Sequence, residues 1–254
     1  MKLIKQCTIY ILFLWLFSGG IVEAYGQSAN AAALEKMPAD LEADFALSAL
    51  PPHIRPGATV FLLDPAKGYY MSRQGTNGFI CFVVRTEWER GEYRSDLASA
   101  ISYDAEGAKT IFPEYADAEV MRASGEYSAA RLKDTMAARF ASGFYKAPAK
   151  PGLSYMLAPL MRTYPGGLEV KNVTTFSIPH YMFYAPYVSE SDIGGNSPAG
   201  GPMILGDGKG PHGYIMVPVG VTEKAAILEA NKDLIRRLVA YKPWFAIQPA
   251  AMHH

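Results

Sequence analysis

Residues 79–84, Phe-Ile-Cys-Phe-Val-Val, form an apolar run that does not alternate with polar side chains. β-Branched and aromatic residues favour strands, and a strand without alternation is usually covered on both faces. We therefore expect this strand at the centre of a sheet. Two strand patterns precede it, at 58–63 and 69–72, and turn residues at 74–78 join the second of them to the run. The spacing predicts an antiparallel meander.

Helical patterns lie outside this block of strands. They cover residues 38–49, residues 128–142 with Ser128 as N-cap and Gly143 as C-cap, and a last segment from Thr222 to Pro243. Further strand patterns follow at 153–164, 173–184 and 214–219. Strands and helices in blocks, without strict alternation, predict an α+β fold with a mainly antiparallel sheet packed with about three to five helices.

The first residues have the pattern of a secretory signal peptide. Lys2 and Lys5 precede an apolar run at 9–17, and Val22-Glu23-Ala24 offers small residues for cleavage after Ala24. The run is short for a membrane span, although an anchor made from the same segment is the alternative. We therefore expect an exported protein, periplasmic or secreted, with no stable membrane span after cleavage.

The rest of the chain has the length of one globular domain. We expect a signal peptide at 1–24, a flexible lead-in at 25–37, a single α+β domain at 38–245 and a tail at 246–254. The linker at 146–151 leaves a division into two domains as the alternative.

Charge and cysteine content narrow the classes of function. The chain holds 24 Lys and Arg against 24 Asp and Glu and has no basic run, which argues against nucleic-acid binding. Cleavage would remove Cys7 and leave Cys81 without an internal disulfide partner. Cys81 lies within the predicted central strand, where a thiol is inert. The chain has no Gly-x-Ser-x-Gly motif and no phosphate-binding glycine loop.

A Pro-His pair followed by Tyr and Met occurs twice, at 179–182 and at 211–216, on either side of a Gly- and Pro-rich loop at 186–211. Side chains in a strand alternate between its faces. If the two strands are neighbours, one face carries the paired histidines, tyrosines and methionines: His180, Met182, Tyr184, His212, Tyr214 and Met216. The loop would close over this face.

This face allows several functions. The main hypothesis is small-molecule binding by His180, Tyr184, His212 and Tyr214 under the loop. Alternatives are a transition-metal or haem site with His180 and His212 as ligands, a hydrolase with one histidine as base, and a structural or partner-binding envelope protein. The histidines can also be half-buried structural residues. No spacing is diagnostic, so the ligand, any cofactor, enzymatic activity and the oligomeric state stay open.

Overall fold

The computed structural model describes residues 33–195, 201–205 and 210–247. These residues form an α+β fold with mostly antiparallel sheets, as the sequence predicts, and six α-helices stand against the expected three to five. The predicted signal peptide at 1–24, most of the lead-in and most of the tail lie outside the described residues.

The first sheet has the strand order β2-β1-β3-β4. Its strands are β1 (Thr59–Asp64), β2 (Gly68–Arg73), β3 (Ile80–Val84) and β4 (Ser99–Tyr103). The expected central strand is β3, which is buried on both faces. The expected meander is wrong, because β3 pairs with β1 in parallel on the side away from β2. Residues 74–78 cross the end of the sheet to make this possible, and the Thr76 N–H donates to the Gly57 carbonyl at 2.7 Å.

The second sheet is fully antiparallel and has the order β5-β8-β10-β9. Its strands are β5 (Leu153–Met156), β8 (His180–Tyr184), β9 (Met203–Leu205) and β10 (Tyr214–Pro218), and a separate pair holds β6 (Met161–Thr163) and β7 (Thr174–Phe176). The strands expected at 153–164 and 173–184 are thus each split between two sheets. Strand β9 lies within the segment expected to be a loop.

The two larger sheets meet edge to edge at β4 and β5. The Ser102 hydroxyl donates to the Tyr155 carbonyl at 3.0 Å and accepts from the Tyr155 N–H at 3.2 Å. The Asp104 N–H donates to the Leu153 carbonyl at 3.3 Å. A side chain therefore takes the place of part of the backbone ladder, and the face of one sheet continues into that of the other.

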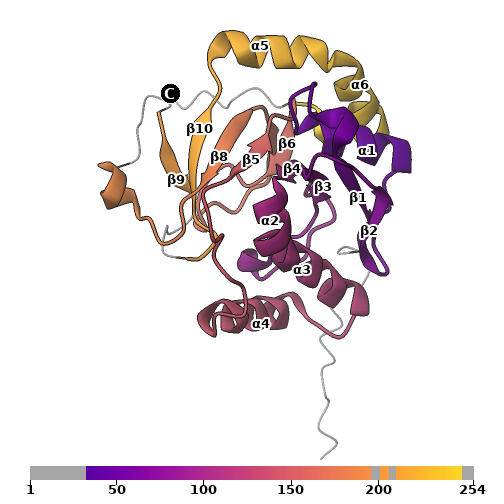
Figure 1. Cartoon of the computed structure of the whole chain (residues 1–254). Coiled ribbons are helices and arrows are strands. Elements are labelled where there is room, and N and C mark those ends of the chain that lie inside the picture. The colour runs from indigo at the N-terminus through magenta and orange to yellow at the C-terminus, as the bar shows by residue number, and fades with distance from the viewer. Residues whose placement is uncertain (1–32, 196–200, 206–209, 248–254) are drawn as a thin grey trace, which may run out of the picture.

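Helices cover the sheets from two sides (Figure 1). The helices are α1 (Ala39–Ser48), α2 (Ala105–Thr110), α3 (Phe112–Ser124), α4 (Ala129–Ala141), α5 (Val221–Ala230) and α6 (Lys232–Tyr241). Helices α1 and α6 pack against one face of the first sheet, where Phe45, Val83 and Leu238 are fully buried. Helices α2 and α3 cover the opposite face, and α4 packs outside α3. The last predicted helix is two helices, which meet at Asn231.

A second core on the α2–α3 side runs across both sheets. It joins Phe82 and Tyr103 of the first sheet to Met182, Tyr184, Tyr214 and Met216 of the second. Because the two sheets are joined edge to edge at β4 and β5, the strands of both Pro-His motifs contribute to the same core as helices α2 and α3.

Candidate functional site

Strands β8 and β10 are neighbours, and their register fixes which residues meet. Tyr184 lies opposite Tyr214, Met182 opposite Met216 and His180 opposite Pro218. Directly opposite residues of an antiparallel pair share a face. On β8 the burial alternates, with His180, Met182 and Tyr184 buried and Phe183 exposed.

The two predicted tyrosines, Tyr184 and Tyr214, lie together, but both of their hydroxyls are hydrogen-bonded to other residues of the protein. The rings of Tyr184 and Tyr214 are 6.2 Å apart. The Tyr184 hydroxyl donates to the Asp104 carboxylate at 2.9 Å, and the Tyr214 hydroxyl shares a hydrogen bond of 2.9 Å with that of Tyr103. Burial raises the pKa of both phenols well above the ordinary value, so both stay neutral. Their role here is to join the second sheet to β4 and the start of α2.

His212 precedes β10 and has both ring nitrogens engaged. Nδ1 pairs with the carboxylate of Glu114 on α3, and Nε2 lies 3.1 Å from the Lys146 carbonyl. The Phe140 ring meets the imidazole edge to face, with centroids 5.2 Å apart. Burial raises the pKa of Glu114, against the opposing effect of His212. With both nitrogens held, His212 offers neither a metal-ligating lone pair nor a base for catalysis in this arrangement.

The register does not bring the two histidines together. His180 is level with Pro218 at one end of β10, whereas His212 lies before Tyr214 at the other end. The strand between these ends spans roughly 14 Å at the usual rise per residue. A single metal ion bound by both His180 and His212 would need the two imidazoles at the same end of β10, whereas they lie at opposite ends.

His180 sits in an arrangement typical of metal-binding histidines. Its side chain is buried, with 2% of the residue exposed, and Nδ1 lies 2.6 Å from the Ile178 carbonyl. A carbonyl can only accept, so Nδ1 carries the proton, and a neutral ring then has a bare lone pair on Nε2. Burial lowers the pKa of His180, which favours the neutral ring. Ligating histidines commonly have the same backbone-carbonyl support on the other nitrogen.

The Nε2 atom of His180 is buried and has no hydrogen-bond partner among the described residues. Buried polar atoms without partners are rare, because each costs about 1–3 kcal/mol. The hydroxyl of Ser154, which is also buried, has no partner within the described parts of the chain either. Ser154 lies opposite Met182, so its side chain shares the face of His180. Two unpartnered polar atoms therefore point to one side of the second sheet.

Four methionines share this face of the second sheet with His180. Met156 is the cross-strand partner of His180, and Met182 follows it two residues along the same strand. Met216 lies opposite Met182, and Met203 lies opposite Met216. Met182 and Met216 are buried, while Met156 and Met203 are partly buried and pack against the same core. Methionine is a common core filler, so the unpartnered imidazole is what distinguishes this cluster.

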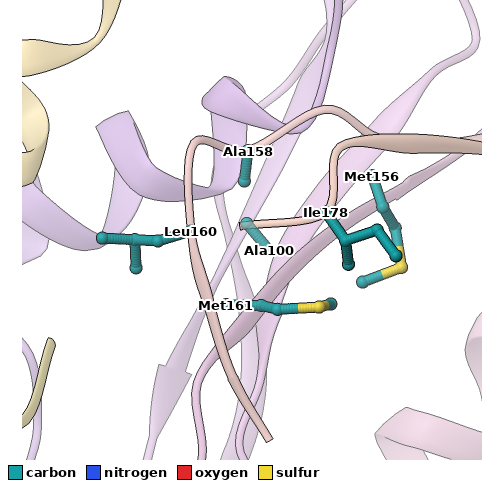
Figure 2. Close-up of a pocket in the computed structure, with 6 residues that line it drawn as sticks. All are labelled: Ala100, Met156, Ala158, Leu160, Met161 and Ile178. Carbon is teal, nitrogen blue, oxygen red and sulfur yellow. The ribbon is translucent and has the colours of Figure 1, made fainter. Parts of the chain in front are cut away.

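A small cavity borders the cluster. It measures about 10 Å³, room for about one water molecule or a small ion. Figure 2 shows Met156 and Ile178 side by side on its wall, with Met161 extending towards them. Ile178 supplies the carbonyl that holds His180, so the cavity lies next to the imidazole's support.

A second hollow, of about 110 Å³, lies between α4 and the segment that joins β6 to β7. One of its charged groups, Arg90, holds that segment in place. Arg90 stacks on Tyr164 with 3.8 Å to the ring centroid and donates to the carbonyls of Gly166, Gly167 and Val170. Pockets for organic ligands usually measure about 300–1,000 Å³, and both hollows are smaller than this.

Other reactive side chains do not add to a site. Cys81 is fully buried on β3, and burial raises the pKa of its thiol to about 12, which keeps it protonated. Within the described ranges no three His, Cys, Asp or Glu side chains are placed to hold one metal ion. A metal at His180 would draw its other ligands from methionine thioethers.

Sequence patterns placed Met182 and Met216 on the face of the histidines but missed Met156 and Met203. Both missed residues come from strands whose partners no local pattern reveals. The alternation of Ser154 and Met156 on β5 was the available signal, but its use requires knowing that β5 pairs with β8.

The comparisons with known proteins identify no relative: no family model, curated protein or solved structure matches the chain. Among the described residues, none of the helices has the length and apolar character needed to cross a membrane.

Proposed function

We propose that this protein is exported and binds a soft metal ion, Cu(I), through the Nε2 atom of His180 and the thioethers of Met156 and Met182. The observation that carries the proposal is the buried Nε2 atom of His180, which has no hydrogen-bond partner in the described structure while Nδ1 is held by a carbonyl. Met156 and Met182 lie on the same face of the sheet as His180. In this arrangement the nitrogen is oriented for a ligand before the ligand arrives.

The ligand set favours Cu(I) over harder ions. Thioethers are soft ligands that select Cu(I), whereas Mg²⁺ and Ca²⁺ take oxygen ligands. Imidazole and thioether are both neutral, so the set offers no negative charge to offset a divalent ion in a buried position. A monovalent ion therefore fits this site better than Zn²⁺ or Cu(II).

Export gives the site a suitable compartment. Cysteine ligands can be lost to disulfides in an oxidising environment, and methionine ligands cannot. The proposal of export rests on the sequence pattern at 1–24. Amino-terminal sequencing of the protein from the envelope fraction or medium of its host is expected to show Tyr25 as the first residue. Intact protein that begins at Met1 and stays in the cytoplasm would contradict the proposal of export.

The test of metal binding is an anaerobic titration of the chain from Tyr25 onward, which keeps every described residue, with Cu(I) held by a competing chromophoric chelator. The matched pair of variants is His180→Ala and His212→Ala, because both remove a buried imidazole from a Pro-His motif. We expect His180→Ala to weaken Cu(I) binding by about 100-fold or more, as loss of a ligand should exceed the cost of losing an outer contact.

The two variants are expected to differ in Cu(I) affinity. His212→Ala is expected to destabilise the protein but to leave Cu(I) affinity unchanged in the folded fraction, which circular dichroism measures. Wild-type protein that takes no Cu(I) from the chelator, or binding that His180→Ala leaves unchanged, would overturn the proposal. A preference for Zn²⁺ in the same competition assay would overturn the assignment of the metal.

A further inference from the structure

Three methionines lie abreast on adjacent strands of the second sheet. Met203 on β9 is the register partner of Met216 on β10, and Met216 is the register partner of Met182 on β8. Neighbouring strands are about 4.8 Å apart, so the row extends roughly 10 Å from the edge of the sheet towards His180.

The exposure of these side chains falls along the row. Met203 is partly buried on the edge strand, Met216 is 6% exposed and Met182 is 2% exposed. His180 follows on β8, two residues before Met182 and on the same face. The row thus leads from a partly accessible thioether to the buried imidazole with one methionine on each strand.

We infer that Met203 and Met216 form an outer loading site for Cu(I), from which the ion passes by way of Met182 to His180. This inference rests on the proposed function and adds the route by which the ion is loaded. The ion remains Cu(I) throughout, and each step exchanges one thioether ligand for the next. Exchange between neighbouring neutral ligands avoids carrying a bare cation through an apolar interior, where an unpaired charge is costly.

The test measures the rate of loading separately from the affinity. Anaerobic stopped-flow mixing with the Cu(I) complex of the chromophoric chelator follows the loss of the chelate absorbance. The variant is Met203→Leu, which keeps an apolar side chain of similar volume. The control is Met71→Leu, because Met71 is an exposed methionine on β2, at the far edge of the other sheet.

We expect Met203→Leu to load about tenfold more slowly than Met71→Leu, with the equilibrium affinity at His180 unchanged. Equal loading rates in the two variants would overturn the route while leaving Cu(I) binding at His180 in place. A matching loss of affinity would also overturn it, since Met203 would then be a ligand of the final site. If the wild-type protein binds no Cu(I), the proposed function fails and the route fails with it.

Discussion

The two Pro-His motifs differ in what surrounds each imidazole. His212 meets a carboxylate on one nitrogen and a carbonyl on the other. His180 meets a carbonyl on one nitrogen and, within the described residues, no hydrogen-bond partner on the other. The same dipeptide therefore gives a structural tie in one place and an available ligand in the other, because hydrogen bonding and not residue type determines the role of a histidine.

A buried carboxyl makes the stability of the protein depend on pH. Glu42 on α1 is 2% exposed and accepts a hydrogen bond of 2.8 Å from the Leu63 N–H. Burial raises its pKa from 4.5 to about 7, against the opposing effects of that hydrogen bond, Arg85 and Lys36. Between these two pKa values the folded protein keeps a proton that the unfolded chain has released. The free energy of unfolding should therefore fall as pH rises from about 4.5 to about 7 and stay low above that.

Replacing Glu42 by Gln should remove this part of the pH dependence. Glutamine keeps an acceptor for the Leu63 N–H but carries no charge, so we expect Glu42→Gln to be more stable than wild type at pH 8, by roughly 2–3 kcal/mol. Urea unfolding at pH 5 and pH 8 measures the difference. The exposed Glu126→Gln serves as control and should leave the slope unchanged. A variant less stable than wild type at pH 8 would contradict this account of Glu42.

At the scale of elements, sequence patterns located most strands and helices but not their partners. The alternation at 179–184 and 211–216 placed His180 and Met182 on one face, because the period of a strand is local information. The pairing of β3 with β1 and the pairing of β5 with β8 depend on contacts distant in sequence, and the meander was wrong for that reason. Helix α2 was missed, although Asp104 caps it by accepting from Glu106 and Gly107.

The pair of Glu114 and His212 links α3 to the start of β10, and its contribution to stability can be predicted. Glu114 and His212 are paired, with side chains only 9% and 6% exposed. Removing one member leaves the other buried without its partner, which costs about 3–5 kcal/mol. We expect His212→Ala and Glu114→Ala each to lower the free energy of unfolding by about this amount, and the double variant to lose much less than the sum. Additive losses in urea unfolding would show that the pair does not couple the two elements.

In the whole molecule, two hydrophobic cores lie on opposite faces of the first sheet and differ in what they contact. The core under α1 and α6 contains the fully buried side chains of Phe45, Val83 and Leu238. The core under α2 and α3 continues across the β4–β5 seam into the methionine face. The second core reaches the face that carries His180, its cross-strand partner Met156 and, two strands away at the edge of the sheet, Met203.

If Nε2 of His180 and methionine sulfur bind the same Cu(I) ion, both atoms should be detected at the metal. Copper X-ray absorption on the chain from Tyr25 onward, loaded anaerobically with one equivalent of Cu(I), detects them. We expect one nitrogen and at least two sulfur neighbours at copper, with the nitrogen contribution lost in His180→Ala and kept in His212→Ala. A copper environment without sulfur, or one unchanged by His180→Ala, would contradict the proposed Cu(I) site.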